Sequence, residues 1–293
     1  MNILITNIGR RVYFVDFLTK LRSELKIKKI FVSDSNKDIS GMNAKNIISI
    51  KIPKVSEGET KYLKFILSIV KKNKIKLIIP CTNYDLLILS KNKKKFDLLN
   101  CNLSISRFEL IEKLLNKKKT YRLCLENKIP TPKIFYTYHE AKKLNKKKFV
   151  KKKIFGHSSL GLKIINEIKK KDFEKEFLIQ KYIEGQEYHM DILNDLNGNF
   201  LSSCTKKKLS MRHGETDIAK LEKSKFFFNF SKKISRIFRH VGNLDCDLIK
   251  DKKGKLYFID FNPRFGGGYA FSHSFGFNFL KLYIARLLKR KVK

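Results

Sequence analysis

The chain has 293 residues, of which 42% are hydrophobic and 12% aromatic, and its formal net charge is +38. This length provides for a substantial core in one large domain or two of ordinary size, and no apolar run approaches the roughly 18 residues of a membrane span. Lysine supplies most of the excess charge in runs along the chain, arginine is sparse and no aromatic-interleaved RNA-binding motif occurs, so we expect no specific nucleic-acid partner.

The cysteines and the N-terminus indicate the compartment. The five cysteines are scattered and never form a CxxC pair, which disfavours a disulfide framework and a zinc site. The first residues lack a basic region before a long apolar segment, so we interpret them as a strand and not as a signal peptide. We therefore expect a cytoplasmic protein.

The first hundred residues alternate short β-rich runs with helical patterns. The runs predict strands at 2–6, 29–34 and 77–80, and helices at 12–25, 62–72 and 85–99. Such alternation predicts a parallel sheet with right-handed crossovers. The turn at 7–11 holds one glycine where a dinucleotide fingerprint needs three. Its arginines either bind an anion at the helix N-terminus or are simply solvated.

The rest of the chain predicts mainly antiparallel strands between helices. Pro130 and Pro132 interrupt the chain after two helical patterns, and Asn197-Gly198 marks a hairpin turn. The predicted helices are 108–115, 119–127, 228–240 and 278–289, and the predicted strands are 133–136, 149–152, 162–165, 177–182, 187–194, 200–204, 246–250 and 256–261.

The loop after the last predicted strand carries the clearest chemical signal. Strand alternation places Asp260 and Asn262 on one face, and Asp247 on the preceding strand can add a third oxygen ligand for Mg²⁺. Arg264 offers a forked donor to phosphate, and the glycines at 266–268 allow close approach of backbone or ligand. The alternative is a glycine-rich turn beside one incidental acid.

Two further segments have weaker signals. In 150–161 a strand leads into a small-residue loop that can fold over phosphates, with Lys151 pointing inward, or that is an exposed turn. In 180–187 a strand, a turn and a new strand offer edge backbone to adenine and a carboxylate to ribose, or form a plain hairpin. His189 and His240 are expected on packed elements, and His273 is a candidate for the acceptor site.

Together these segments resemble the ATP-grasp superfamily, and most closely its carbamoyl-phosphate-synthase-like branch. The matching stretches, in order, are 3–12, 78–90, 116–133, 150–161, 178–193, 206–216 and 259–279. The resemblance implies α/β plus α+β architecture: a Rossmann-like pre-ATP-grasp domain at 1–103, then an ATP-grasp fold of two α+β subdomains at 104–293, with a lid at about 118–183.

The resemblance also implies roles for particular residues. Those that would bind ATP are Lys117, Lys151, Gly156, Ser158, Ser159, Gly161, Gln180, Lys181, Tyr182, Ile183 and Glu187. Those that would bind magnesium are Asp247, Asp260 and Asn262, and those that would face the reacting groups are Arg264, Lys206, Lys208 and Arg212. For the last three, plain surface charge is the alternative.

Several positions depart from the pattern of the superfamily. Lys152 stands where proline is usual, His157 where a small residue is usual, and Lys181 where glutamate is common. Asp247 replaces a common glutamine and Asp260 a glutamate, which keeps oxygen ligands but shortens the acid at 260 by one methylene.

The resemblance implies an ADP-forming ligase that joins a small-molecule carboxylate to an amine through an acyl phosphate. ATP and Mg²⁺ would be required, Mn²⁺ is an alternative ion, and a homodimer is possible. The chain has one ATP-grasp unit, so carbamoyl phosphate synthesis is not expected. The alternatives are a degenerate ATP-grasp protein that binds nucleotide without ligation, and a polyanion-binding protein that depends on charge alone.

Overall fold

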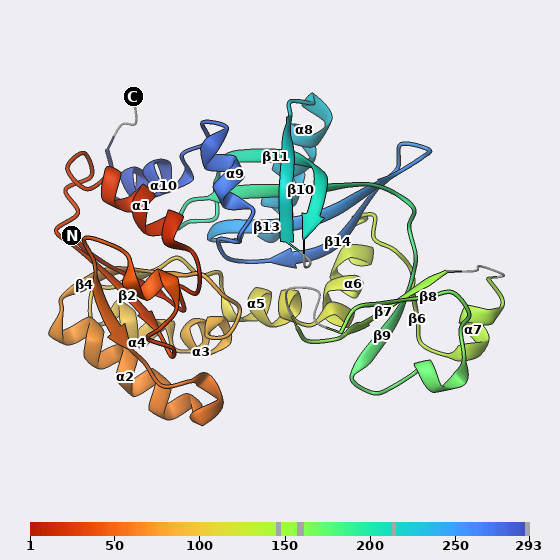
Figure 1. The fold of residues 1–293 in the computed structure, drawn as a ribbon, viewed down its shortest axis with the longest axis horizontal. Helices are drawn as coiled ribbons and strands as arrows, with labels where there is room; N and C mark the ends of the chain where they lie inside the picture. The colour runs from red at the N-terminus through yellow and green to blue at the C-terminus, as the bar shows by residue number, and fades with distance from the viewer. Residues whose placement is uncertain (145–147, 157–160, 213–214, 291–293) are drawn as a thin grey trace.

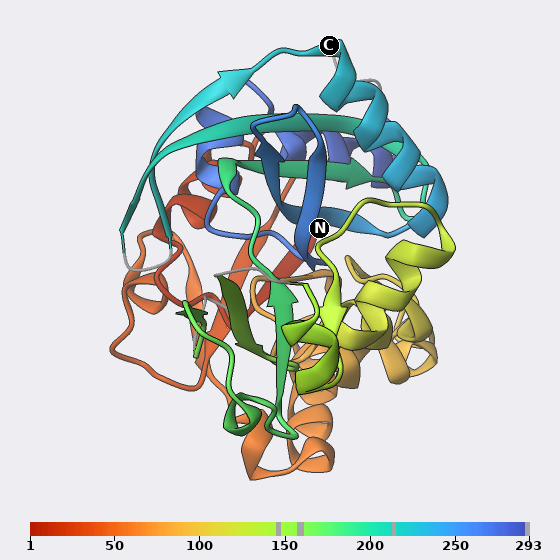
Figure 2. The ribbon, with the colours of Figure 1, turned by 90° about the vertical axis from the view of Figure 1, so that its right-hand side faces the viewer.

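Three sheets form the framework of the molecule in its computed structural model, which describes residues 1–144, 148–156, 161–212 and 215–290. Figure 1 shows an N-terminal sheet at one end, a small sheet at the other, and a large antiparallel sheet that extends above both. Figure 2 looks from the end of the small sheet and shows the strong curvature of the large one. Among the helices described, none is long and apolar enough to cross a membrane.

The N-terminal sheet is parallel throughout, with strand order β3-β2-β1-β4-β5. Its strands are β1 (Asn2–Thr6), β2 (Lys29–Asp34), β3 (Ile48–Lys51), β4 (Ile75–Pro80) and β5 (Asn102–Leu103), and its helices are α1 (Val12–Lys20), α2 (Glu59–Lys72), α3 (Leu86–Lys91) and α4 (Lys93–Asp97). Short 3₁₀ helices lie at Ser40–Asn43 and Val55–Glu57. The predicted parallel sheet is confirmed.

The differences from prediction in this part have local causes. The edge strand β3 was missed because its side chains are mostly exposed, and β5 because it has only two residues. The helix predicted at 12–25 ends at Lys20, and the one predicted at 85–99 is broken at Asn92, which ends α3 and begins α4.

The last helix of the chain joins the N-terminal sheet to the rest of the molecule. Residues alternate along β1, so that Ile3 and Ile5 face one side and Leu4 the other. On the first side they share a core with Phe14 of α1 and with Tyr283 of α10 (Phe279–Leu287), and both helices lie together in Figure 1. Apolar burial therefore holds the two ends of the chain against each other.

The large sheet is antiparallel, with strand order β12-β11-β10-β13-β14. Its strands are β10 (Gly185–Asn194), β11 (Phe200–Arg212), β12 (Glu215–Glu222), β13 (Gly242–Asp251) and β14 (Leu256–Asn262), and the nearby helices are α5 (Phe108–Leu115), α6 (Lys117–Glu126), α8 (Lys225–Phe238) and α9 (Tyr269–Ser274). Met190, Cys246 and Phe258 pack with α8 in an apolar core on one face. The other face carries charged side chains.

Sequence patterns failed where charged residues occupy strands of the large sheet. The strand predicted at 200–204 continues to Arg212 and pairs with β12, which was not predicted. The lysines at 206–208 conceal this strand, since Lys206 is fully buried as an ion pair with Asp191 and does not follow the apolar pattern.

The small sheet, called the lid after the prediction for 118–183, has strand order β6-β9-β7-β8. Its elements are β6 (Ile134–Phe135), α7 (Tyr138–Lys142), β7 (Phe149–Lys153), β8 (Lys163–Ile165), a 3₁₀ turn at Lys170–Asp172 and β9 (Phe177–Lys181). Phe135, Phe149 and Ile179 form its apolar core. The antiparallel arrangement predicted for this region is confirmed, and with it the α/β plus α+β class.

His240 is a buried histidine at the junction of α8 and β13. Its Nε2–H donates to the carbonyl oxygen of Ile192 at 3.0 Å, and Nδ1 accepts from Asn194 Nδ2 at 3.4 Å. Burial lowers the pKa of His240 from 6.5 to about 4, against the opposing effect of the Ile192 bond. The folded protein therefore holds this ring neutral at neutral pH.

Acidification should destabilise the fold through His240. Between pH 6.5 and about pH 4, His240 is protonated in the unfolded chain but neutral in the folded one. A change from pH 7 to pH 5 should therefore lower the free energy of unfolding by about 2 kcal/mol through this residue. Urea unfolding followed by circular dichroism measures the loss. His240→Gln should show a loss smaller by that amount, and an equal loss in both proteins would contradict the assignment.

Candidate active site

A cavity of about 660 Å³ opens where the three sheets approach one another. The turn after β1 contributes Arg11, helix α1 contributes Tyr13, the loop after β4 contributes Asn83, and the lid contributes Lys152 and Gly156. The remaining lining includes Lys117, Glu187, His189, Lys208, Asp245, Asp247, Asp260, Asn262, Arg264, Gly267 and Gly268. Half of the predicted site residues that the structure describes, including all three predicted metal ligands, thus line one cavity.

The pairing of β13 with β14 brings the oxygen ligands together. Asp247 lies opposite Asp260, and Asp245 lies opposite Asn262. Between Asp247 and Leu248 the register shifts, which leaves Ile259 as the extra residue of a bulge. The expectation that Asp247, Asp260 and Asn262 converge agrees with this geometry, because all three line the cavity.

Lysine ammonium groups form ion pairs with Asp260 and Asp247. Lys117 Nζ donates to both oxygens of Asp260, at 2.9 and 2.8 Å. Lys208 Nζ lies 2.8 Å from Asp247 Oδ1 and 3.3 Å from Glu187 Oε2. Burial would raise the pKa of Asp247, but Lys208 and His189 outweigh burial and hold that pKa well below its usual range.

These residues fit a hard divalent cation. Three oxygen-bearing side chains on adjacent strands face one cavity, and two lysines now supply the positive charge that an ion would bring. Asn262 is held by a further contact, since its Oδ1 accepts from Asn83 Nδ2 at 3.0 Å. The loop after β4 therefore touches the candidate metal ligands directly.

Lys151 and Lys152 point to opposite sides of β7. Lys151, the residue that we predicted to contact phosphate, pairs with Glu174 and lies 5.0 Å from the centre of the Phe177 ring, outside the cavity. Lys152 lines the cavity and donates to the carbonyl oxygen of Ile259 at 3.1 Å. Burial and the neighbouring Lys117 lower the pKa of Lys152 to about 8. The lysine of this strand that faces the candidate site is therefore Lys152.

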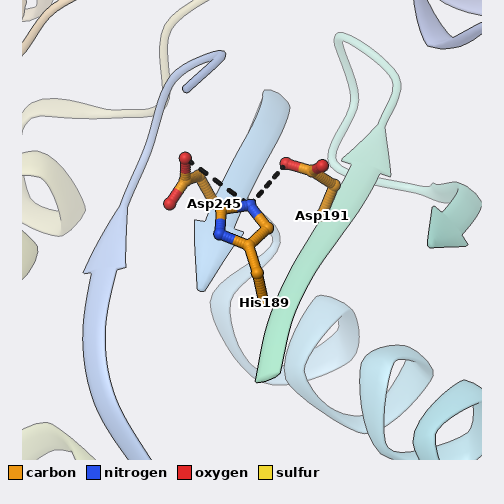
Figure 3. Close-up of side chains that lie close together, drawn as sticks. All are labelled: His189, Asp191 and Asp245. Atoms are coloured by element: carbon orange, nitrogen blue, oxygen red, sulfur yellow. Dashed lines mark hydrogen bonds and ion pairs between the residues drawn. The ribbon is translucent and has the colours of Figure 1, made fainter. Parts of the chain in front are cut away.

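His189 lies between Asp191 and Asp245, as Figure 3 shows, and lines the cavity. Its Nε2 is 3.5 Å from Asp191 Oδ1 and 3.7 Å from Asp245 Oδ2. Burial and Lys206 lower the pKa of His189, but the two carboxylates prevail and raise it to about 9. The ring is therefore a cation at neutral pH.

The three residues have ligand atoms within 4.8 Å of one another, close enough to hold a metal ion. A protonated histidine donates hydrogen bonds and cannot ligate a metal through that nitrogen. Lys206 already pairs with Asp191, and Arg264 Nη1 lies 2.9 Å from Asp245 Oδ2. We therefore interpret the cluster as a buried ion-pair network that fixes Arg264.

The glycine loop packs tightly against this network. A Cβ atom on Gly268 would lie 2.7 Å from the His189 ring, and one on Gly266 would lie 1.6 Å from Asp245 Oδ2. The predicted close approach at these glycines is thus an approach to charged side chains of β10 and β13. Any side chain at Gly266 would displace Arg264 from its acid.

The other predicted residues lie in varied surroundings. Lys206 is buried and also donates to the Gly268 carbonyl oxygen at 2.9 Å and to Ser272 Oγ at 2.8 Å, while Arg212 is exposed and pairs with Asp217 at 3.4 Å. Gln180 Nε2 donates to the Pro132 carbonyl oxygen at 3.0 Å.

Around the lid, Lys181 donates its backbone N–H to Lys133, Tyr182 lies beneath Lys148, and Ile183 is buried. Gly156 lines the cavity, and Gly161 has a φ of +77°. His157, Ser158 and Ser159 fall outside the described residues. His273 stacks on Phe17, with ring centres 3.4 Å apart, and does not line the cavity.

Comparison with known proteins identifies the family. The profile described as "ATP-grasp domain" matches residues 114–268, and the profile described as "PylC-like, N-terminal domain" matches residues 3–104. The chain therefore belongs to the ATP-grasp family, as its sequence predicted. No curated protein matches the chain.

Solved structures share the fold at low identity. The biotin carboxylase domain of Hydrogenobacter thermophilus 2-oxoglutarate carboxylase, solved with MgADP and bicarbonate, has a TM-score of 0.73 at 16% identity and covers 100% of this chain and 70% of its own. The L-amino acid ligase of Bacillus licheniformis has a TM-score of 0.71 at 20% identity, and the match covers 97% of this chain and 73% of the ligase. The N5-carboxyaminoimidazole ribonucleotide synthetase of Thermotoga maritima has a TM-score of 0.71 at 13% identity, and the match covers 100% of this chain and 77% of the synthetase.

Substitution of the two neighbouring lysines tests which one meets nucleotide. Lys152→Met, which keeps the side-chain volume, should weaken MgATP binding by roughly 10- to 100-fold, the cost of one charge-assisted contact. Lys151→Met should leave it unchanged, because that side chain is held by Glu174 outside the cavity. Titration calorimetry measures MgATP affinity in both variants. A larger loss in Lys151→Met than in Lys152→Met would contradict the geometry.

Proposed function

We propose that the protein is an ATP-dependent, ADP-forming ligase that joins a small-molecule carboxylate to an amine. The observation that carries this proposal is the convergence of Asp247, Asp260 and Asn262 with Lys117, Lys152 and Lys208 in one cavity. Phosphoryl transfer needs positioned cations and no protein nucleophile, which matches this inventory.

The lysines have two alternative sets of partners in this proposal. In the structure, Lys117 neutralises Asp260 and Lys208 neutralises Asp247. When ATP enters, the ammonium groups of Lys117 and Lys152 turn to phosphate oxygens. Asp247, Asp260 and Asn262 would then be free to hold Mg²⁺ or Mn²⁺, which would supply positive charge to the phosphates.

The nucleotide base and sugar lie toward the junction of lid and large sheet. Glu187 lines the cavity there and receives the ribose hydroxyls, which compete with Lys208 for its carboxylate. The segment 180–183 contacts adenine through its backbone, because the Gln180 side chain is turned toward Pro132. Gly156, which also lines the cavity, lies toward the phosphates.

The bond changes follow from this placement. An oxygen of the substrate carboxylate attacks the γ-phosphorus, and the bond to ADP breaks. The resulting acyl phosphate lies near Arg264, whose guanidinium is held by Asp245 beside the glycine loop. The amine then attacks the acyl carbon, loses a proton and releases phosphate. The protein contributes mainly orientation and charge neutralisation.

The metal ligands provide the direct test. Asp260→Ala combined with Asn262→Ala should abolish magnesium-dependent ADP release, which a coupled assay records over a panel of amino acids, other acids and amines. Asp97→Ala, an exposed carboxylate outside the cavity, is the matched control and should retain turnover. ADP release that persists in the double variant would refute the site.

A protein that binds nucleotide without ligation is the second candidate. Lys206 is buried in an ion-pair network and Arg212 is exposed, so two cations predicted to face the reacting groups lie elsewhere. This candidate predicts thermal stabilisation by MgATP with no ADP release for any acid and amine pair. The Hydrogenobacter thermophilus domain is a dimer, and a homodimer stays a prediction for this chain.

A further inference from the structure

Arg11 places a charge in the cavity that no acid of the described residues neutralises. It ends the turn after β1, lines the cavity, and is only partly exposed. Its Nη1 donates weakly to the Ile8 carbonyl oxygen at 3.4 Å, while its buried Nε has no hydrogen-bond partner among the described residues. A partly buried cation of this kind is costly unless a ligand supplies the counter-charge.

The turn that carries Arg11 is rigidly held. Gly9 N–H donates to Asp34 Oδ2 at 2.9 Å, and the Gly9 carbonyl oxygen accepts from Gly41 N–H at 3.0 Å. A Cβ on Gly41 would lie 2.3 Å from that oxygen, so position 41 must be glycine for the contact to form. The backbone that carries Arg11 is therefore held by contacts that need no ligand.

Arg264 brings a second guanidinium group, again with an Nε unpaired in the described part of the chain, to the same end of the cavity. Its Nη1 is taken by Asp245, but its buried Nε also lacks a partner within the described ranges. Tyr13 stands near both arginines and donates to the Gly266 carbonyl oxygen at 3.1 Å. Burial raises the pKa of Tyr13, and Arg11 and Arg264 are both close enough to oppose that rise.

The phosphate groups of ATP do not account for Arg11. Lys117, Lys152 and Lys208 serve the half of the cavity beside the lid, whereas Arg11 and Tyr13 come from the turn after β1 and from α1. The loop after β4 adds Asn83, which reaches Asn262 and so lies next to the candidate metal ligands. A substrate that spans from Arg11 to Asn262 would meet the γ-phosphate at one end and the unpaired guanidinium at the other.

We propose that Arg11 binds a carboxylate that the reaction does not consume. One of the two substrates therefore carries a carboxylate in addition to its reacting group: either the acid is a dicarboxylate, or the amine is an amino acid. Arg264 meets the reacting carboxylate, and Arg11 anchors the spectator one through its free guanidinium edge. The inference rests on the proposed ligase function, whose cavity it shares.

Paired probes distinguish the two sources of the carboxylate. Calorimetry in the presence of MgADP compares glutarate with its monoamide, for the acid, and glycine with glycinamide, for the amine. The protein variants are Arg11→Gln, Arg11→Lys and, as a charge-matched control, the exposed Arg107→Gln outside the cavity. MgADP affinity, measured in every variant, reports an intact nucleotide site.

We expect one pair to show a preference for the carboxylate, and Arg11→Gln to weaken that probe by roughly 10- to 100-fold with MgADP affinity unchanged. Arg11→Lys should recover part of the loss, and Arg107→Gln should bind as the wild type does. If neither glutarate nor glycine binds the wild type, or if both bind Arg11→Gln as well as they bind the wild type, the proposal that Arg11 anchors a carboxylate is overturned.

The outcome also separates the anchor from the ligase. Carboxylate binding that depends on Arg11, without ADP release for any pair, would retain the anchor and refute ligation. ADP release whose KM values are unaltered in Arg11→Gln would retain ligation and refute the anchor.

Discussion

The antiparallel register between β13 and β14 determines where every charge of the candidate site lies. It sets Asp247 opposite Asp260 and Asp245 opposite Asn262, which concentrates carboxylates on one face of the sheet. Carboxylates on adjacent strands repel one another unless cations lie between them. Lys117 and Lys208 compensate one part of this face, and His189 with Arg264 the other.

This division separates exchangeable cations from fixed ones. Lys117 and Lys208 stand at the cavity wall, where phosphate can replace their carboxylate partners. His189 and Lys206 are buried beneath the glycine loop, and Gly266 and Gly268 leave no room for a side chain there. The fixed network holds Arg264 in place, so the end of the cavity proposed to meet the reacting groups is organised by contacts within the protein.

The sequence predicted the parallel sheet, the antiparallel remainder and the ATP-grasp family, because these depend on apolar periodicity and on ordered short motifs. It missed β12 and most of β11, where lysines interrupt the apolar pattern. Periodicity also could not decide between Lys151 and Lys152, since adjacent strand residues face opposite sides and the lysine run marks neither. Asp191 and Asp245 went unnoticed because single acids on strands carry no local signal.

The central claim is that Lys117 and Asp260 exchange partners when nucleotide binds. A crystal structure with Mn²⁺ and a non-hydrolysable ATP analogue, with anomalous scattering to locate the ion, tests it most directly. We expect a manganese peak among Asp247, Asp260 and Asn262, with Lys117 Nζ moved from Asp260 to a phosphate oxygen. A nucleotide bound elsewhere, or a Lys117–Asp260 ion pair that survives beside the phosphates, would contradict it.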